Sequence, residues 1–543
     1  LSVVGTFLVL LVVNQFTEVS VFALNMTTAM GLGLAIDYSL FIVTRYREEL
    51  RAGYEPPEAV RRTVRTAGKT VLFSALTVAA SLSALLVFDI AFLRSFAYAG
   101  LAVATLAGLY AIVVLPAMLA ALGHRINSLT LWKRSVTPSE EGFWHRMAVV
   151  VMRRPIPITA VVLVVLLFLG SPFLNLRLGF PDDRVLPEDK PTREVHDIIR
   201  TDFSSEEAGA ISVVMTDLAD PAARAADVDA YARTLAAVPG VTRVDAETGV
   251  YCGSAGSVGG FPCQPGEPLP VDTALLTDRF SRPAATYLSV VPDVEPLSAE
   301  GRALAERIRA TEPAFAGERL VGGQSAQLID ATGSLYGDLP LALGIIAVVT
   351  FVLLFLMFGS VVVPIKALVL NMLSLTATFG AMVWVFQDGH GSGVLDFTPT
   401  GALTATIPVL MFCVAFGMSM DYEVFLLSRV KEEHDHGADN VQAVARGLEK
   451  TGRIVTAAAV LISVVFLAFA TSEVSFIKLF GIGLTLAVLL DAFVIRGTLV
   501  PAFMRLAGEA NWWAPAWMRG IYDRFGISET GDVEEEREVI VAR

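Results

Sequence analysis

The sequence predicts an α-helical, polytopic membrane protein that carries one α/β domain of the ferredoxin-like type outside the membrane. Three observations lead to this fold class. The 543 residues are 54% hydrophobic and only 17% charged, and the mean hydropathy is +0.60. Soluble proteins of this size do not have such a composition, whereas polytopic membrane proteins do. The apolar residues form ten long runs, and the one extended polar region, Asn175–Asp338, alternates short strand and helix patterns.

Each of the ten apolar runs is long enough to be a candidate span, because a helix needs about 20 residues to cross the hydrocarbon core. In chain order the runs are Leu1–Gln15, Val21–Thr44, Val71–Phe88, Leu93–Leu122, Ile156–Leu174, Leu339–Phe358, Val363–Phe386, Leu403–Leu427, Val455–Ala470 and Phe476–Leu506. The chain begins inside the first run without a methionine. We therefore expect an N-terminally incomplete protein.

The distribution of Lys and Arg predicts the orientation of the spans. The loops after the second, fourth and eighth runs are rich in Lys and Arg, whereas residues 16–20, 89–92 and 387–398 contain neither. Basic loops stay on the cytoplasmic side. We therefore expect both ends of this chain to be cytoplasmic, the protein to lie in the cell inner membrane, and Asn175–Asp338 to lie outside.

These predictions divide the chain into six regions. They are the spans of a first repeat (1–123), a basic cytoplasmic loop (124–154), a single span (155–174), the outside domain (175–338), the spans of a second repeat (339–506) and a cytoplasmic tail (507–543).

A duplication organises the chain. Gly31–Leu50 and Ala415–His434 carry the same pattern, in which Asp-Tyr is followed by Phe, Arg and a pair of Glu residues. The match continues through the next three runs at nearly constant spacing, so four helices are duplicated in parallel topology. The second copy is preceded by a span, an outside domain and two more spans. By extrapolation, roughly 200 residues with a first outside domain would precede the first copy.

The duplicated aspartates are the candidate functional residues. Asp37 lies eight residues before Arg45, so a helical rise of ~1.5 Å per residue places its carboxyl ~12 Å inside the membrane boundary. An ionised carboxylate there costs at least ~2.5 kcal/mol unless it faces protein or water. A structural aspartate that hydrogen-bonds a neighbouring helix is the alternative. The Asp-Tyr pair recurs at Asp421 in the second repeat, and this recurrence favours a proton site over a structural aspartate.

The outside domain has the strand and helix order of a split ferredoxin-like fold. The expected elements are the helix Pro191–Phe203, the strand Ala210–Thr216, the helix Asp220–Val238, the strands Val241–Thr248 and Ala285–Val291, the helix Ser298–Thr311 and the strand Arg319–Gly322. A Gly- and Pro-rich excursion, Tyr251–Pro270, holds Cys252 and Cys263. In an oxidising exterior we expect these two to form a disulfide, with free thiols as the alternative.

At this point the motifs resemble those of the RND superfamily, and within it the mycobacterial membrane protein large (MmpL) family of actinobacterial exporters. The residues that carry the resemblance are GLAIDYSLF at Gly33–Phe41, GMSMDYEVFLLSR at Gly417–Arg429, LVGGQSA at Leu320–Ala326 and LLDAFVIRGTLVPA at Leu489–Ala502. The resemblance implies an RND-type bundle in which about ten of twelve spans are present, numbered three to twelve, and in which residues 175–338 form the second porter domain.

The resemblance also implies a proton relay at the centre of the bundle. Its residues here would be Asp37, Tyr38, Asp421, Tyr422 and Ser74, the last of which corresponds to Ala458 in the second repeat. Phe41 and Phe425 would pack beside the relay.

Asp491 and Arg496 are a weaker candidate pair in the last span. Because they are five residues apart, they are not expected to face one another on an α-helix. A supporting role for the relay and a purely structural role are both open.

Three functions compete. The first is a secondary transporter, driven by the proton-motive force, that exports lipids or other hydrophobic molecules to the cell envelope. The second is a non-transporting sensor or assembly subunit of the same fold. The third is an intramembrane aspartyl protease, but the Tyr-Asp and Gly-x-Gly-Asp motifs of such enzymes are absent from the ten apolar runs. We therefore expect no enzyme activity.

The expected partners are a lipid or hydrophobic substrate and the membrane, with periplasmic accessory proteins compatible with this architecture and no role for nucleic acid. Protons are the expected coupling ion, and neither another cofactor nor a metal site is predicted, because two cysteines in the polar excursion and Cys413 in an apolar run do not make a metal set. The sequence specifies neither the substrate nor the oligomeric state. Trp512, Trp513 and Trp517 suit the membrane–water interface, and the tail Glu529–Glu538 is acidic.

Overall fold

The computed structural model describes residues 1–127, 142–203, 207–218, 223–272, 276, 279–314 and 318–526. The acidic tail Glu529–Glu538 and part of the predicted basic loop 124–154 lie outside this range. The chain forms two compact units, a helical one made of Leu1–Arg177 and Asp338–Arg543, and a smaller one made of Leu178–Gly337. The sequence predicts the corresponding boundaries at residues 175 and 338.

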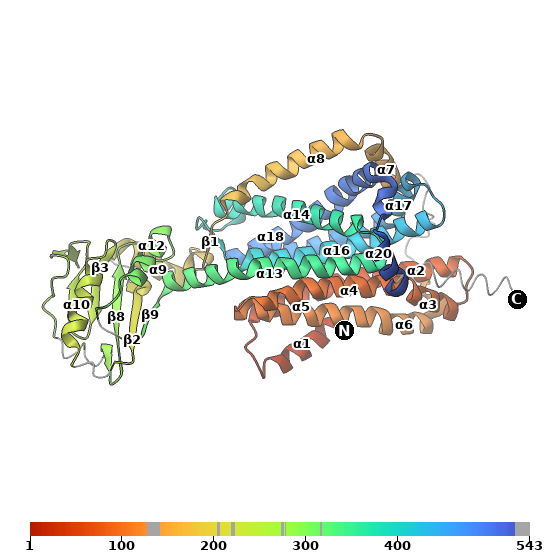
Figure 1. Ribbon diagram of the computed structural model, residues 1–543. Helices are drawn as coiled ribbons and strands as arrows, with labels where there is room; N and C mark the ends of the chain where they lie inside the picture. Colours follow the sequence, from red (N-terminus) through yellow and green to blue (C-terminus); the bar gives the residue numbers. More distant parts are fainter. Residues whose placement is uncertain are drawn as a thin grey trace. The chain divides into compact units, whose positions relative to one another are not determined.

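The helical unit contains two groups of helices and a connecting pair (Figure 1). The first group is α1 (Ser2–Val13), α2 (Val21–Arg51), α3 (Pro56–Arg65), α4 (Ala67–Ser83), α5 (Ala91–Leu109) and α6 (Leu115–Leu122). The connecting pair is α7 (Phe143–Arg153) and α8 (Pro155–Gly170). The second group is α13 (Gln324–Phe358), α14 (Val362–Met382), α15 (Ser392–Leu395), α16 (Thr406–Asp435), α17 (Asn440–Leu467), α18 (Ser475–Leu489), α19 (Val500–Ala507) and α20 (Ala516–Phe525), with the two-residue strand β10 (Leu403–Thr404) before α16.

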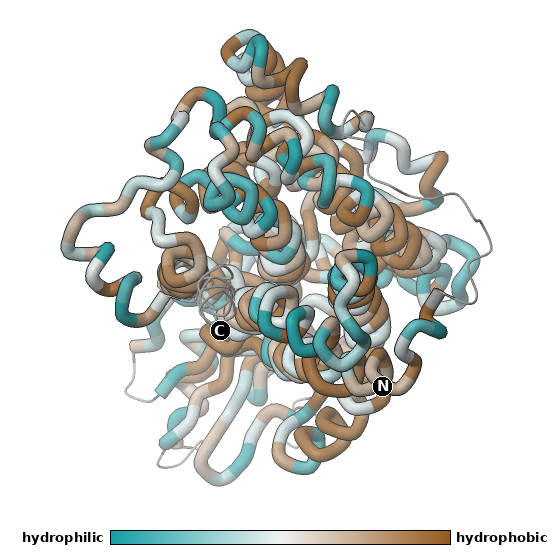
Figure 2. The backbone as a smooth tube through the Cα atoms, turned by 90° about the vertical axis from the view of Figure 1, so that its right-hand side faces the viewer, coloured by the Kyte–Doolittle hydropathy of each residue, from teal (hydrophilic) through white to brown (hydrophobic). Residues whose placement is uncertain are grey.

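Among the described residues, nine helices are long and apolar enough to cross a membrane. They correspond to the second to tenth predicted runs. The first run, Leu1–Gln15, is the apolar helix Ser2–Val13, which is shorter than the others. Figure 2 is a view along the axes of these helices, and it shows hydrophilic residues at the helix ends and loops nearest the viewer. The protein is therefore a multi-pass membrane protein.

The two repeats pack against each other through corresponding helices. Helix α2 of the first repeat packs against α17 of the second, and helix α16 of the second repeat packs against α4 of the first. Because α2 corresponds to α16 and α4 to α17, the two contacts are copies of one another. Of the nine candidate spans, α16 is the most buried, so its Asp-Tyr pair lies at the centre of the helical unit.

The equivalent helices also end alike. Gly53 follows α2 with φ +93°, and Gly437 follows α16 with φ +88°. Only glycine adopts this backbone conformation without a steric penalty, which makes it the usual residue just past a helix end. Gly53 and Gly437 thus mark equivalent positions, at which the membrane-spanning helices α2 and α16 end.

Both repeats contain a π-helical segment at the same place, just before a Leu/Val-Pro-Ala sequence. The segments are Tyr110–Val114 and Leu490–Leu499. A third lies in another span, at Val383–Gln387. Such segments are rare and shift the faces of the residues that follow.

The smaller unit confirms the predicted ferredoxin-like order. Its main sheet runs β4-β3-β8-β2-β9, with β7 paired to β8, and the pairings that are described are antiparallel. The strands are β2 (Ile211–Thr216), β3 (Val241–Ala246), β4 (Gly249–Cys252), β7 (Ser281–Arg282), β8 (Ala285–Pro292) and β9 (Glu318–Gly322), and the helices are α9 (Pro191–Asp202), α10 (Ala225–Ala236) and α12 (Ala299–Ala310). The remaining strands are β1 (Leu178–Gly179), β5 (Ser257–Val258) and β6 (Phe261–Pro262).

The core of this unit follows the alternation in its strands. Strand β2 buries every second residue, Ile211, Val213 and Met215, and these pack with the buried faces of α10 and α12. Four strands in the order β3-β8-β2-β9 with two helices on the sheet are what the predicted βαβ…βαβ order requires.

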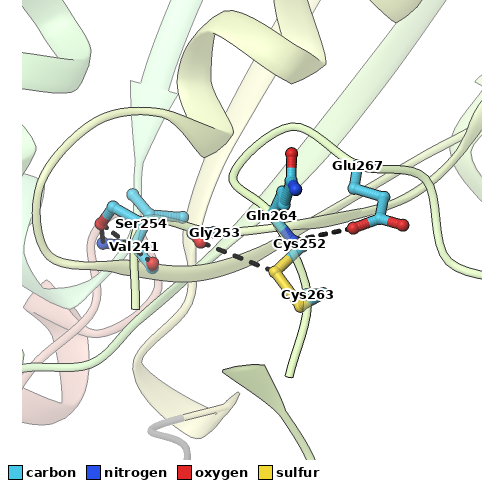
Figure 3. Close-up of a disulfide and its surroundings, with 7 residues drawn as sticks. All are labelled: Val241, Cys252, Gly253, Ser254, Cys263, Gln264 and Glu267. Atoms are coloured by element: carbon cyan, nitrogen blue, oxygen red, sulfur yellow. Dashed lines mark hydrogen bonds between the residues drawn. A yellow bond between two sulfur atoms is a disulfide. The ribbon is translucent and has the colours of Figure 1, made fainter. Parts of the chain in front are cut away.

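The Gly-rich excursion folds into a small hairpin that a disulfide joins to the sheet. Cys252, at the end of β4, is bonded to Cys263, which follows β6, with the two Cα atoms 6.1 Å apart (Figure 3). The backbone adds to the link, because Cys263 N donates to Gly256 O at 3.0 Å. The hairpin therefore depends on covalent and backbone bonds rather than on buried side chains.

Candidate functional site: a buried carboxylate cluster between the repeats

The structure brings together all five residues predicted for the relay. Tyr422 Oη donates a hydrogen bond to Asp37 Oδ2 at 2.8 Å, and Tyr38 Oη donates to Asp421 Oδ2 at 3.3 Å. Ser74 Oγ donates to Asp421 Oδ1 at 2.5 Å. We call Asp37, Tyr38, Ser74, Asp421 and Tyr422 the relay cluster. Each aspartate is thus held by the tyrosine of the other repeat, so the two hydrogen bonds cross the interface between α2 and α16.

The relay cluster is buried. Asp37 is 5% exposed and Asp421 is 2% exposed, and both tyrosines are equally enclosed. A buried carboxylate is costly unless hydrogen-bond donors surround it. Asp37 Oδ2 and both carboxylate oxygens of Asp421 accept hydrogen bonds, but Asp37 Oδ1 accepts none from the described residues.

The two aspartates therefore have different surroundings, although their helices are copies. Asp421 accepts bonds from a tyrosine and a serine, whereas Asp37 accepts one from a tyrosine only. The serine's counterpart is Ala458, which lines a small cavity beside Asp37 together with Thr451 and Tyr422. That cavity has a volume of about 10 Å³, which is about the space that one water molecule requires.

On one side of the relay cluster, two aromatic rings close the space between the repeats. Phe41 and Phe425 are stacked with their centroids 4.4 Å apart. The resemblance implies that these two rings pack beside the relay, and both also line the small cavity at Asp37.

Beyond the aromatic pair lies a set of charges that we call the ion-pair ring, made of Arg45, Glu48, Arg429 and Glu432. Arg429 Nη2 lies 3.0 Å from Glu48 Oε2, and Arg45 Nη1 lies 3.4 Å from Glu432 Oε1. Each arginine also pairs with the glutamate three residues ahead in its own helix. These pairs again exchange equivalent residues between the repeats, so the ring ties the ends of α2 and α16 together.

At the opposite end of the same helices, phenylalanines from both repeats line an apolar pocket. Its lining includes Phe22, Phe92, Phe96, Phe476 and Phe480. Phe22 contacts Phe476 of the other repeat with ring centroids 5.3 Å apart. The relay cluster thus lies between an aromatic region at one end and the ion-pair ring at the other.

Asp491 and Arg496 face one another, contrary to the sequence-based expectation. Arg496 Nη2 lies 2.7 Å from Asp491 Oδ2, and Arg496 Nε lies 2.9 Å from the same oxygen. The expectation assumed 3.6 residues per turn. The segment Leu490–Leu499 is π-helical, and its i→i+5 hydrogen bonds place residues five apart on one face.

Sequence reasoning missed two further charges that join this pair. Glu423, which follows the relay tyrosine, lies 3.2 Å from Lys366 Nζ and 3.9 Å from Arg496 Nη1. The four side chains of this buried ion network (Lys366, Glu423, Asp491 and Arg496) are almost fully enclosed and their formal charges sum to zero. The signal in the sequence was a second carboxylate beside Tyr422 and a lysine inside an apolar run, both of which are costly within a membrane.

The ion network contacts the relay cluster directly. The Arg496 guanidinium lies 5.4 Å from the centroid of the Tyr422 ring, and its Nη2 donates to the backbone oxygen of Ser419. The first repeat has no equivalent, because Ser39 and Ala107 stand where Glu423 and Asp491 stand in the second. The ion network therefore packs against Tyr422 of the second repeat, and the sequence provides no equivalent network for Tyr38 of the first repeat.

Comparisons with known proteins are consistent over nearly the whole chain. The chain is 37% identical to the trehalose monomycolate exporter MmpL3 of Mycolicibacterium smegmatis over 99% of this chain and 53% of that protein. It is 38% identical to the membrane protein SCO6666 of Streptomyces coelicolor, covering 97% of this chain and 68% of that protein. It is 31% identical to the mycolic acid-containing lipids exporter MmpL11 of M. smegmatis, covering 95% and 52%.

This chain thus spans about half the length of the two exporters. Among solved structures, a SecDF crystal structure aligns with a TM-score of 0.48 at 15% identity, covering 93% of this chain and 57% of that one. The model of the MMPL family matches residues 1–158 and 184–525. The chain therefore belongs to the MMPL family, within the RND superfamily.

Proposed function

We propose that this chain is the transmembrane and second porter part of a transporter that uses the proton-motive force to export a lipid or another hydrophobic molecule. The crossed hydrogen bonds between the two Asp-Tyr pairs carry the proposal. These two bonds join equivalent residues of the two repeats at the centre of the helical unit.

The chemistry of these bonds supports coupling between a proton and a movement of helices. A hydrogen bond from a tyrosine to an ionised carboxylate is about twice as strong as one between neutral groups. When a proton binds Asp37 or Asp421, the carboxylate loses its charge and its bond across the interface weakens. The two repeats are then freer to shift relative to one another, and loss of the proton restores the bond.

The membrane potential can supply the energy for this cycle. One proton that crosses 100 mV contributes ~2.3 kcal/mol, which is comparable to the strength of a charge-assisted hydrogen bond in a protein. The expected direction is proton entry from the side of the porter domain and release at the ion-pair ring. This follows from the predicted orientation, with both ends of the chain on the cytoplasmic side of the inner membrane.

The names of the relatives support the substrate class. MmpL3 is named as an exporter of trehalose monomycolate and MmpL11 as an exporter of mycolic acid-containing lipids. We propose a lipid or similarly hydrophobic substrate for this protein, without a choice among lipids, and periplasmic accessory proteins as further partners.

The test is transport by the full-length protein in proteoliposomes under an imposed proton gradient. Proton influx and the transfer of a fluorescent lipid are measured together. We expect Asp37→Asn and Asp421→Asn to abolish both, because each substitution keeps the size of the side chain but removes the titrating group. Asp89→Asn, at an exposed aspartate outside the cluster, is the matched control and should transport normally.

Two results would overturn the proposal. Coupled transport that persists in both Asp variants would show that the crossed bonds are structural. Absence of any proton influx in the wild-type protein, with its full set of lipids and accessory proteins present, would favour the alternative of a non-transporting sensor or assembly subunit.

A further inference from the structure

Helix α20, the last described helix, exposes a row of large apolar side chains. Trp517 is 70% exposed, Ile521 is 41% exposed and Phe525 is 60% exposed. Residues four apart share one face of an α-helix, so these three form a continuous stripe. Arg519 and Asp523 lie on the opposite face and are also exposed. The helix is therefore amphipathic, with its apolar stripe uncovered.

A different side of α20 is held by the helical unit. Tyr522 lies edge-on to Phe355 with ring centroids 6.4 Å apart, and its ring is so near Gly359 that an added Cβ would come within 3.0 Å of it. Phe355 and Gly359 lie at the end of α13. On a helical wheel, the side of Tyr522 is next to the Trp517–Phe525 stripe rather than opposite it. One flank of the helix thus contacts protein and the neighbouring flank does not.

The position of α20 along the membrane normal is fixed by the turn between α13 and α14. Ser360 Oγ donates to Asn511 O at 2.6 Å, and Val361 N donates to Trp513 O at 3.1 Å. Because α13 and α14 are both candidate spans, the turn that joins them lies at a surface of the bilayer. Helix α20 begins three residues after Trp513, at that surface, and Figure 1 shows it lying across the direction of the long helices.

We propose that the apolar stripe of α20 binds the headgroup boundary of the lipid bilayer, so that this helix lies in the membrane interface. Helix α13, which α20 contacts through Tyr522, also exposes apolar side chains: Val348 is 63% exposed and Val352 is 45% exposed. Tryptophan is enriched at this depth, and an amphipathic helix of this kind is stable there because its apolar side leaves water.

The charges on α20 fit the same occupant. Arg519 lies on the polar side of the helix, and Arg524, seven residues after Trp517, lies at the edge of the stripe with its guanidinium 5.3 Å from the centroid of the Phe525 ring. The long arginine side chain at that edge can reach lipid phosphates while its stem stays beside the apolar side chains.

Tyr522 contacts Phe355 near the C-terminal end of α13, the candidate span Gln324–Phe358. Binding of α20 to the bilayer would therefore fix that end of α13. The proposal concerns an interaction surface and does not depend on proton transport.

The test uses spin labels at two positions of α20 in the full-length protein. Ile521→Cys and Arg519→Cys are made in a Cys413→Ser background, so that the disulfide holds both of the other cysteines of this sequence, and the background protein without an added cysteine is labelled in parallel to measure any other labelling. The proteins are placed in nanodiscs of phosphatidylcholine with phosphatidylglycerol. Collision of each label with oxygen, which concentrates in lipid, is compared with collision with a water-soluble nickel chelate.

We expect the label at position 521 to favour oxygen and the label at position 519 to favour the nickel chelate. A nickel preference at both positions would overturn the proposal, because the stripe would then face water. Protection of position 521 from both reagents would also overturn it, since protein would then cover the stripe. Labels at Trp517→Cys and Asp523→Cys repeat the comparison if either first variant does not fold.

Discussion

At the scale of single residues, the main finding is that the duplicated aspartates accept different numbers of hydrogen bonds. Asp421 accepts two hydrogen bonds, one of them from Ser74, whereas Asp37 accepts one and faces a cavity lined by Ala458. The difference between a serine and an alanine at equivalent positions thus distinguishes two sites that the repeat would otherwise make alike. Of the two, Asp37 has a free oxygen that can hold a proton without losing a protein donor.

Ser74→Ala should separate the energetic role of this serine from its role in the relay. Loss of the donor leaves Asp421 Oδ1 buried without its partner, which costs roughly 1–3 kcal/mol. We expect a lower melting temperature in detergent and a reduced proton influx in proteoliposomes.

Ser81→Ala is the matched control, because Ser81 Oγ also joins α4 to α16, by a bond of 2.6 Å to Cys413 O, but lies two turns from Ser74. It should lower stability by a similar amount and leave proton influx unchanged. Equal losses of influx in the two variants would mean that Ser74 acts only through packing.

At the scale of elements, the π-helical segment of the last span determines which charges meet. It places Asp491 and Arg496 on one face, from which Arg496 also reaches Glu423 and the ring of Tyr422. A straight α-helix would separate the pair by about 140° around the axis. The buried ion network therefore depends on the irregular backbone.

Arg496→Met should be strongly destabilising, because it leaves Asp491 buried without a cation. Removing one partner of a buried pair costs about 3–5 kcal/mol. Replacing both, in Asp491→Leu with Arg496→Met, should recover most of that stability while proton transport stays low. Unfolding in increasing sodium dodecyl sulfate measures the stability of each variant. Equal stability of the single and double variants would contradict this explanation.

The ion-pair ring should limit the passage of protons at its end of the relay. Arg429→Gln removes the pair with Glu48 at 3.0 Å and the pair with Glu432 at 2.7 Å. We expect a several-fold increase in passive proton leak in proteoliposomes without substrate. Arg446→Gln is the control, since Arg446 is half exposed and pairs only loosely, at 3.7 Å, with Glu433. An unchanged leak in Arg429→Gln would show that the ring does not close this path.

The disulfide hairpin of the smaller unit gives a prediction that is independent of transport. Cys252→Ser with Cys263→Ser should destabilise the hairpin, because the disulfide closes a short loop whose constraint is worth up to about 3 kcal/mol. Limited proteolysis of the whole protein should then cut near Ser257–Pro262 faster, while the main sheet stays protected. Unchanged cleavage would show that the backbone bonds of the hairpin suffice.

At the scale of the whole molecule, the sequence predicted the parts whose signals are local or repeated. The apolar runs predicted the nine candidate spans among the described residues, and the chain order of strands and helices between residues 191 and 322 predicted the ferredoxin-like sheet. Hydropathy and strand alternation need only a few neighbouring residues. The duplication matched Gly31–Leu50 with Ala415–His434, and the family resemblance added the long-range expectation that their Asp-Tyr pairs meet at the centre of the bundle.

The sequence could not predict contacts that depend on backbone irregularity or on side chains from a third helix. The pairing of Asp491 with Arg496 follows from a π-helix, which has no reliable sequence signal, and the role of Lys366 follows from the placement of α14 beside α16. The crossed pairing of each aspartate with the other repeat's tyrosine likewise required the relative height of α2 and α16.

The most direct test of the central claim is to observe the protonation of the two aspartates. Infrared difference spectra of the full-length protein in lipid, recorded on a change of pH, report the C=O stretch of protonated carboxyl groups. We predict a carboxyl band that rises as pH falls, loses intensity in Asp37→Asn and in Asp421→Asn, and is unchanged in Asp89→Asn. A band that is the same in all four proteins would contradict a proton relay at the crossed Asp-Tyr pairs.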